Sequence, residues 1–307
     1  MSVLATESPD TLQNLCLRYI ARDIVPASSD ISRDAVVLRN SFQIPNGTFI
    51  HSAIADLLIL QMSACGTLCN ESLQLFQSST ACLRNAVIRR SPVTAAGLRV
   101  LRSHKLVTLV VEPNDPKQLT IADIMCCLNE WTVTNLRSLG VSGVTFGQSG
   151  GPPVIVSLCA LRNLHSLDVS RTDFTDNMLK IIVDDLPLLE SLDISSTLVK
   201  DVTSLSQCRT RLRQLLMCNI RLQDSASVDV LRTLSALRVL DMSHDPSSTS
   251  FSSFKMNAVT AESILLEGSE FHDLISLDIS CMSNVHVGLV RYGVIHNRPY
   301  SICLNLH

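Results

Sequence analysis

The chain has 307 residues, which is more than one compact core needs but is an ordinary length for a protein built from stacked repeats. Hydrophobic residues make up 46% of the chain, charged residues 17% and aromatic residues only 4%, so we expect a core of thin aliphatic layers. The formal charge of −3 gives no electrostatic reason to expect a nucleic acid or an anionic membrane as a partner.

The N-terminal residues and the cysteines indicate where the protein works. Residues 1–10 lack the basic segment and apolar core of a signal peptide, and the most apolar stretch, residues 53–60, is too short to span a bilayer. The eleven cysteines are scattered, without the two close pairs that a zinc site uses. We therefore expect a soluble intracellular protein, cytoplasmic or nuclear or both, with free thiols, no metal and no cofactor.

The first expected element is a helix over residues 9–20. Ser8 is a typical N-cap and Pro9 a typical first helical residue. Apolar residues then recur at the spacing that places them on one side of a helix: Leu12, Leu15, Cys16, Tyr19 and Ile20. Taken alone, this pattern indicates an amphipathic helix that covers the end of the first repeat.

Three of these residues carry a more specific signal. Leu12, Cys16 and Ile20 stand four residues apart, so they form a ridge along the helix. The ridge resembles the BC-box, the elongin-binding helix of cullin-2 and cullin-5 receptors. Leu12 would fill a pocket and the small Cys16 would permit a close approach between helices. We expect this ridge to be open to a partner, with Leu15 and Tyr19 available to pack inward.

The main signal in the chain is a repeated pattern of apolar residues, L-x-x-L-x-L. It occurs openly in residues 164–169, 189–194, 237–242 and 274–279. Weaker copies begin at residues 106, 136 and 212, and a degenerate copy begins at residue 83. Most intervals between these starts are close to the period of about 20–29 residues that is typical of leucine-rich repeats. About eight such copies in near-register predict a repeat protein.

The pattern predicts the fold because side chains alternate along a strand, so the second and third apolar residues of each copy point inward. We expect short parallel strands at residues 108–111, 138–141, 166–169, 191–194, 214–217, 239–242 and 276–279. Their central leucines should be buried: Leu167, Leu192, Leu215, Leu240 and Leu277. Return helices should open at Thr120 and Asp176, and Pro187 should follow the end of the second.

The predicted fold class is therefore α/β, a leucine-rich-repeat solenoid with a curved parallel sheet and helices on its convex side. We expect two parts: an N-terminal helical box region over residues 1–80, and about eight leucine-rich repeats over residues 81–307. Polar residues follow each strand. Thr172 and Thr197 occupy the position where such repeats usually carry Asn, and their hydroxyls can bond to the backbone of the turn.

A row of acidic residues accompanies the strands and should share the concave face: Asp168, Asp193, Asp241 and Asp278. One interpretation is a row of acceptors for a basic or amide-rich partner. The other is a turn residue that bonds to the backbone or to a neighbouring serine. A catalytic carboxylate pair is excluded, because the four residues come from different turns and no His or nucleophile accompanies them.

Most of the chain resembles the N-terminal part of the Zyg-eleven/Zer-one family of cullin-2 receptors. The resemblance rests on LQNLCLRYI, on ACLRNAVIRRSPVTAAGLRVLRSHKLVTL, on LTIADIMCCL, on LESLDISSTLVKDVTSL, and on LISLDIS with HNRPYS near the end. It implies a substrate-recognition subunit of a cullin-2 ubiquitin ligase, with elongin C (bound to elongin B), cullin-2 and an unknown protein substrate as partners. The residues implied for elongin binding are Leu12, Leu15, Cys16 and Ile20.

Two departures from the family pattern limit this implication. The first departure is in the cullin box, whose family pattern is an apolar residue, Pro, any two residues and a second apolar residue. In this chain the box begins as Ile44-Pro45, but the second apolar residue, Phe49, comes one position too late. An alternative register runs from Ile50 to Ile54 and lacks the proline. Known members also continue into armadillo-type repeats that bind N-terminal glycine, which these 307 residues do not contain, so that activity is not implied.

Two functions remain open from the sequence. The first is the ligase substrate receptor; the alternative is a non-catalytic leucine-rich-repeat scaffold that has lost its coupling to the ligase. We do not expect an enzyme, because the sequence contains no Gly-rich phosphate loop, no metal-binding cluster and no recognisable catalytic triad.

Overall fold

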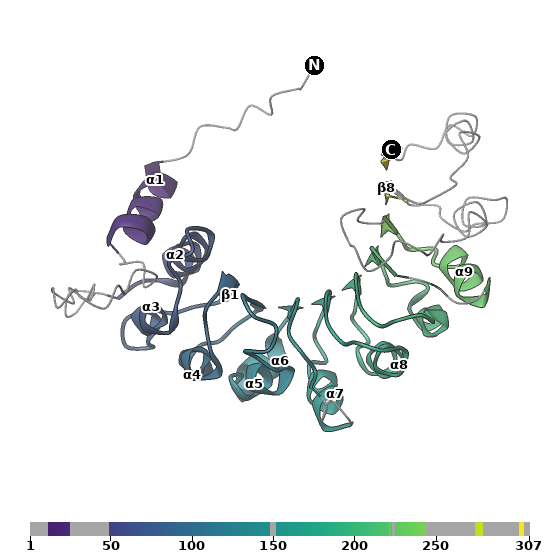
Figure 1. Cartoon of the computed structure of the whole chain (residues 1–307), viewed down its shortest axis with the longest axis horizontal. Coiled ribbons are helices and arrows are strands. Elements are labelled where there is room, and N and C mark those ends of the chain that lie inside the picture. The colour runs from purple at the N-terminus through teal and green to yellow at the C-terminus, as the bar shows by residue number, and fades with distance from the viewer. Residues whose placement is uncertain are drawn as a thin grey trace, which may run out of the picture. The chain divides into compact units, whose positions relative to one another are not determined.

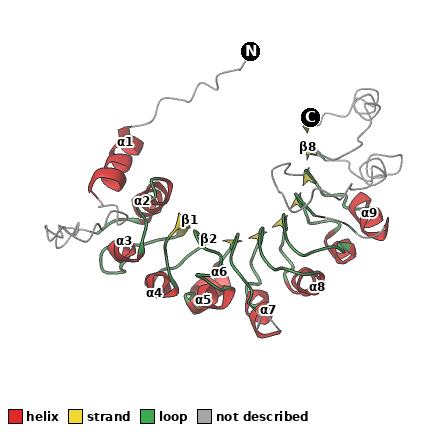
Figure 2. Cartoon of the chain, in the orientation of Figure 1, coloured by secondary structure: helices red, strands yellow, loops and turns green. Residues whose placement is uncertain are grey.

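The computed structural model describes residues 12–24, 49–147, 152–220, 222, 225–243, 274–278 and 301–303. The chain divides into two compact units, Met1–Val133 and Thr134–His307. Within each unit, strands and helices alternate along the chain, and the helices lie on one side of the row of strands (Figures 1 and 2). The predicted division at residue 80 stays a prediction; the first unit contains that region together with the first two repeats.

The first unit begins with two longer helices and continues with short elements. Its elements are α1 (Leu12–Tyr19), the π-helical turn η1 (Ile20–Ile24), α2 (Ser52–Ala64), α3 (Asn70–Leu73), η2 (Gln74–Phe76), β1 (Asn85–Ser91), α4 (Ala95–Leu98), η3 (Arg99–Ser103), β2 (Thr108–Pro113), α5 (Ile121–Cys126) and α6 (Glu130–Asn135), whose last two residues lie beyond the boundary. Strands β1 and β2 pair in parallel, as predicted for leucine-rich repeats.

The second unit consists of strands joined by helical or 3₁₀ return segments. They are β3 (Ser138–Gly140), α7 (Pro152–Cys159), β4 (Ser166–Asp168), α8 (Asp176–Asp185), β5 (Ser191–Asp193), η4 (Thr203–Cys208), β6 (Gln214–Leu216), α9 (Ser225–Arg232), β7 (Val239–Asp241), β8 (Ser276–Asp278) and β9 (Ser301–Cys303). Neighbouring strands from β3 to β9 pair in parallel and in chain order.

A column of aligned apolar residues forms the core of the second unit. Leu167 pairs with Leu192, Leu192 with Leu215, and so on along the sheet. The five leucines that the pattern places inside are each at most 1% exposed: Leu167, Leu192, Leu215, Leu240 and Leu277. The prediction of the fold and of its core is therefore confirmed, since identical positions of successive repeats stack on one another.

The strands agree with the predicted ranges but end one residue earlier in the second unit. The backbone ladder itself continues by one residue, because Val169 N–H donates to the Asp193 carbonyl and Ile194 N–H to the Leu216 carbonyl, each at 2.9 Å. In the first unit, β2 extends two residues beyond the predicted range of 108–111, and β1 contains an irregularity between Arg89 and Ser91. Strand β9 was not predicted, because its segment lacks the full hexad.

Five repeats pass through one residue in the left-handed region, at the end of the strand or just after it. These residues are Arg90 (φ 47°), Gly143 (φ 73°), Arg171 (φ 57°), Ser196 (φ 55°) and Asn219 (φ 60°). All five occupy the same place in their repeats, seven residues after the first leucine position. The recurrence of a conformation that non-glycine residues seldom adopt indicates that the repeat geometry, not the residue type, imposes the turn.

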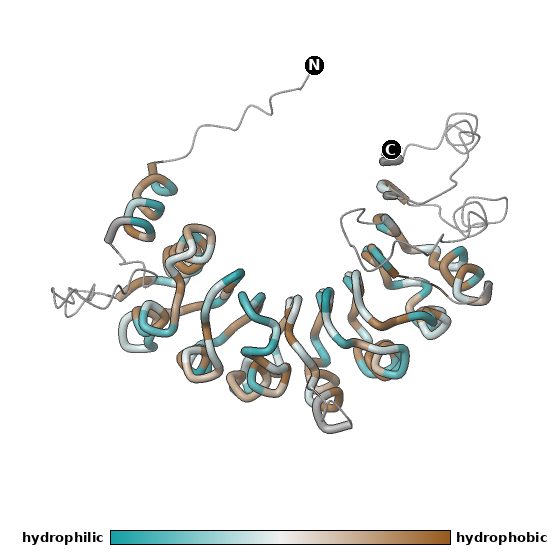
Figure 3. The backbone as a smooth tube through the Cα atoms, viewed as in Figure 1, coloured by the Kyte–Doolittle hydropathy of each residue, from teal (hydrophilic) through white to brown (hydrophobic). Residues whose placement is uncertain are grey.

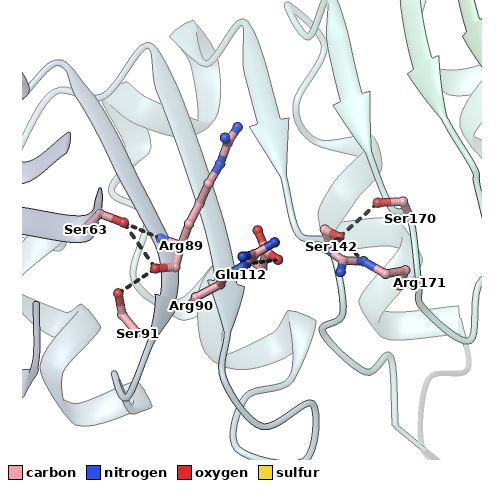
Figure 4. Close-up of polar contacts among 8 residues, drawn as sticks. All are labelled: Ser63, Arg89, Arg90, Ser91, Glu112, Ser142, Ser170 and Arg171. Atoms are coloured by element: carbon pink, nitrogen blue, oxygen red, sulfur yellow. Dashed lines mark hydrogen bonds and ion pairs between the residues drawn. The ribbon is translucent and has the colours of Figure 1, made fainter. Parts of the chain in front are cut away.

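Threonine hydroxyls close two of these turns. Thr172 Oγ1 donates to the Val169 carbonyl at 2.6 Å, and Thr197 Oγ1 donates to the Ile194 carbonyl at 2.7 Å. The predicted bonding of these two residues to the turn backbone is confirmed. In the same turn as Thr172, the Arg171 guanidinium bonds to Ser142 Oγ of the preceding repeat (Figure 4).

The predicted return helices are present. Helix α5 starts after Thr120, whose hydroxyl accepts the Asp123 N–H at 3.2 Å while the Asp123 carboxylate accepts the Thr120 N–H at 3.0 Å. Helix α8 starts at Asp176 and ends at Asp185, two residues before Pro187. In the part of the chain that the structure describes, no helix is long and apolar enough to cross a membrane.

Helix α2 covers the free edge of β1. The Asp56 carboxylate accepts the Arg84 N–H at 2.9 Å and the Asn85 side-chain amide at 2.8 Å. Two helical turns later, Ser63 Oγ accepts the Arg89 N–H at 2.7 Å and donates to the Arg89 carbonyl at 3.2 Å (Figure 4). An open sheet edge invites pairing with other chains, so this helix protects the start of the sheet.

Candidate functional site

Helix α1 has one buried side and one exposed apolar side. Leu17 and Ala21 are 5% and 0% exposed, on the side where α1 and η1 contact α2. On the opposite side, Leu12 is 77% exposed, Tyr19 61% and Leu15 50%. Cys16 is exposed between them. We call Leu12, Leu15, Cys16 and Tyr19 the α1 apolar face; hydrophobic and hydrophilic residues alternate around this helix in Figure 3.

The four residues implied for elongin binding do not all lie on the same side of the helix. Leu12, Leu15 and Cys16 belong to the α1 apolar face, whereas Ile20 is half-buried at the start of η1. The expectation that Leu15 and Tyr19 pack inward is wrong. The inner side of the helix is occupied by Leu17 and Ala21 instead, because these residues lie on the opposite side of the helix from Leu12.

The residues implied for cullin binding lie before and within α2. Ile44 and Pro45 are outside the described residues. Phe49 and Ile54 are exposed at 47% and 46%, while Ile50 is half-buried. The backbone of Ile50 is held by a bridge to the segment before β1, since its N–H donates to the Thr80 carbonyl at 2.8 Å. Thus Phe49 and Ile54 are accessible to a partner, and Ile50 is fixed by the fold.

The open face of the second unit, which was predicted to be concave, carries the acidic row. Each described carboxylate in it accepts the backbone N–H two residues later: Asp168 from Ser170 at 2.9 Å, Asp193 from Ser195 at 2.9 Å, and Asp241 from Ser243 at 2.8 Å. The turn-residue interpretation is therefore confirmed for these three, and their role in partner binding stays a prediction. The backbone of Asp278 continues the row in β8, but its side chain is outside the described residues.

The carboxylates of this row are close enough to influence one another. Strand pairing places Asp168 opposite Asp193, and Leu216 separates Asp193 from Asp241. Burial raises the pKa of Asp193, the bonds from Ser195 lower it in part, and the charges of Asp168 and Asp241 raise it further. The ionised row is therefore under mutual repulsion, which a cationic group on a partner would relieve.

This arrangement predicts the effect of Asp193→Asn. Folding raises the pKa of this carboxyl group, so its ionised form destabilises the folded state at pH values above the raised pKa. At pH values below the unfolded pKa of 3.8 the group is protonated in both states and the effect is absent. The amide keeps an oxygen acceptor for Ser195 and carries no charge. We expect a higher melting temperature than the wild type at pH 7, with the difference vanishing as the pH falls toward 4. Asp184→Asn, at an exposed position of α8, is the control. A lower melting temperature for Asp193→Asn at pH 7 would contradict this account.

Two buried cysteines of the repeats are unsuited to act as nucleophiles. Burial raises the pKa of Cys127 to about 11 and that of Cys159 to about 12, so both are protonated thiols at neutral pH. Among the described residues, no group of three or more His, Cys, Asp or Glu side chains is placed to hold a metal ion. What the described surfaces offer is contact area: the α1 apolar face, the exposed residues of α2, and the open face of the second unit.

The chain has a leucine-rich-repeat fold. No protein-family model matches it. Among solved structures it is similar to an internalin (inlF) from Listeria monocytogenes, with a TM-score of 0.42 and 13% identity over 81% of this chain and 77% of that one. It is similar to internalin C2 (inlC2) of the same organism, with a TM-score of 0.40 and 17% identity over 77% and 84%. It is also similar to a chain of the Toll–Spatzle complex from Drosophila, with a TM-score of 0.47 and 13% identity over 76% and 29%.

Proposed function

We propose that this protein is the substrate-recognition subunit of a cullin-2–elongin B/C ubiquitin ligase, and that it is not itself an enzyme. In this proposal the α1 apolar face binds elongin C, the exposed residues Phe49 and Ile54 face cullin-2, and the repeats hold a protein substrate. The observation that carries the proposal is the exposure of the α1 apolar face, in which Leu12 is 77% exposed. A short helix with one side packed on the fold has little reason to display an apolar face on its other side unless a partner covers it.

The structure of α1 suits docking into a groove. A helix of eight residues is marginal in water by itself, and here its inner side is anchored by Leu17 against α2. Its outer side offers apolar residues separated by three and four positions, which is the arrangement that binds in hydrophobic grooves. Because of this contact, we expect α1 to be folded before a partner binds. A helix that is already folded lowers the entropic cost of binding.

The open face of the second unit supports the substrate-binding part of the proposal. It combines half-buried serine hydroxyls with the acidic row, for example Ser166, Asp168, Ser191 and Asp193. In this part of the proposal the substrate contributes basic or amide groups, because an ionised carboxylate is an acceptor that can take more hydrogen bonds than the one from the turn.

A non-catalytic scaffold is the second candidate, and one observation favours it. Helix α2 covers the edge of β1 through Asp56 and Ser63, and α1 packs on α2, so both helices have a structural role without any ligase. The test of the proposed ligase role must therefore give a different result if these helices only cap the sheet.

Affinity purification of the intact chain from cells separates the two candidates. The ligase proposal expects elongin C, elongin B and cullin-2 to be recovered together. Recovery of elongins without cullin-2, or of neither, would favour the scaffold. A charge substitution on the α1 apolar face, Cys16→Lys, is the control, because an unpaired charge in a tight apolar contact is strongly disfavoured. Its expected result is the loss of all three partners.

A further inference from the structure

We propose that Tyr19, rather than Ile20, is the third anchor of the α1 apolar face when it binds elongin C. This inference rests on the proposed function and changes the residues that the sequence motif implies. The motif runs through Leu12, Cys16 and Ile20. The face that the folded chain presents runs through Leu12, Leu15, Cys16 and Tyr19.

The position of each side chain around the helix axis explains this difference. At 3.6 residues per turn, Tyr19 lies about 20° from Leu12 around the axis, whereas Ile20 lies about 80° away on the other side. That rotation moves Ile20 toward Leu17 and Ala21, which are buried. The π-helical turn also begins at Ile20, so the regular spacing of the ridge ends there. A partner that covers Leu12 and Cys16 therefore meets Tyr19 before it meets Ile20.

The chemistry of Tyr19 fits the role of an anchor. Its side chain is 61% exposed in the free chain, so binding can bury a large apolar ring. Tyrosine loses little conformational entropy on binding, and it is enriched among the residues that dominate interface energies. Its hydroxyl requires a hydrogen-bond partner or water once the ring is covered. The partner surface that fits is an apolar groove with a polar group at its rim.

Positively charged residues beside the α1 apolar face indicate which charges the partner surface carries. Residues 12–24 contain one acidic residue, Asp23, and two arginines, Arg18 and Arg22. Both arginines are exposed; α-helical geometry places Arg18 on the flank next to Leu15, and Arg22 follows in η1. Charge complementarity then predicts carboxylates along the wall of the elongin C groove that lies beside Leu15 and Tyr19.

Binding of the purified elongin B–elongin C complex to the intact chain, measured by calorimetry, tests the inference. We expect Tyr19→Ala to weaken binding by roughly 30-fold or more, as for a dominant interface residue. Tyr19→Phe keeps the ring and should weaken it by only a few fold. Ile20→Ala should weaken it less than Tyr19→Ala. Thermal melting of each variant checks that the fold is intact, and any variant that melts early is replaced by the milder Tyr19→Leu or Ile20→Val.

The charged flank has its own variant. Arg22→Glu should weaken binding at low salt by about tenfold, and the effect should shrink at high salt. The matched control is Arg102→Glu, at an exposed arginine of η3 in the same unit.

The outcomes distinguish this inference from the proposed function. If the wild-type chain does not bind the elongin complex, both are wrong. If the wild-type chain binds but Tyr19→Ala binds equally well, or Ile20→Ala loses more affinity than Tyr19→Ala, the proposed function stands and the third anchor is Ile20. Loss of affinity with Tyr19→Ala alone supports the inference.

Discussion

Replacing Leu192 by Ala is expected to lower the free energy of unfolding of the second unit by about 2–5 kcal/mol. Leu192 is 0% exposed and lies in register between Leu167 of β4 and Leu215 of β6. Its removal opens a cavity between stacked repeats, and the sheet ladder on both sides prevents the neighbouring leucines from moving into it. Chemical denaturation followed by circular dichroism measures the loss.

Leu198→Ala provides the matched control for this substitution. Leu198 belongs to the same repeat, but its side chain is 57% exposed, so its truncation removes little buried surface. We expect a change within about 0.5 kcal/mol. Equal effects of the two substitutions would mean that the column of aligned leucines is not the core of the solenoid.

The second large effect is expected at His104, which connects three segments of the first unit. Its side chain is 2% exposed. Nδ1 accepts the Leu83 N–H at 3.2 Å, and Nε2 lies 2.6 Å from the Phe76 carbonyl oxygen. A backbone N–H can only donate and a carbonyl can only accept, so the ring is neutral with its hydrogen on Nε2. His104→Ala leaves both backbone groups without this partner, at a cost of about 1–3 kcal/mol each, or about 2–6 kcal/mol in total.

The same geometry predicts a dependence on pH. Burial lowers the pKa of His104 below its ordinary value of 6.5, and the Phe76 carbonyl and the charge of Asp56 offset this in part. Because the folded state favours the neutral ring, the stabilisation is complete above pH 6.5 and is lost as the pH falls toward the lowered pKa. Trp131 is the single tryptophan of the chain and lies in α6 of this unit, so its fluorescence can follow the unfolding.

The variant His165→Ala is the control for the pH dependence of stability. His165 in the second unit is half-buried, and its side chain bonds within its own segment, through Nδ1 to the Asn163 carbonyl at 2.8 Å. The loss of stability between pH 7 and pH 5 should be smaller in His104→Ala than in the wild type or in His165→Ala. An unaltered pH dependence in His104→Ala would show that this ring does not titrate with folding.

The repeats could be predicted from the sequence because their signal is local and periodic. Leu189, Leu192 and Ile194 are buried for the same reason as Leu164, Leu167 and Val169, so one repeat predicts the next. The turn bonds of Thr172 and Thr197 follow from the same periodicity. By contrast, β9 was missed because its sequence, Ser-Ile-Cys, carries too little of the pattern.

Contacts between distant residues could not be predicted in this way. Asp56 and Ser63 bond to residues 26 to 29 positions later in the chain, and no sequence period connects them. His104 bonds to a carbonyl 28 residues earlier, which depends on how two segments fold back on each other. The face that α1 exposes was also ambiguous, because apolar residues cover more than half of its circumference, and only packing against α2 decides which of them are buried.

The most direct measurement of the central claim is the binding of purified elongin B–elongin C to the intact chain, with and without the double substitution L12S/C16K. Leu12 and Cys16 are exposed in the free chain, so the variant should keep the circular dichroism spectrum and melting temperature of the wild type. A polar Ser in place of the anchor and an unpaired Lys charge in a close helix contact should abolish binding. We expect the double substitution to abolish binding and to leave the fold intact. Binding that survives the double substitution, or a wild-type chain that does not bind, would show that α1 is not an elongin-binding helix.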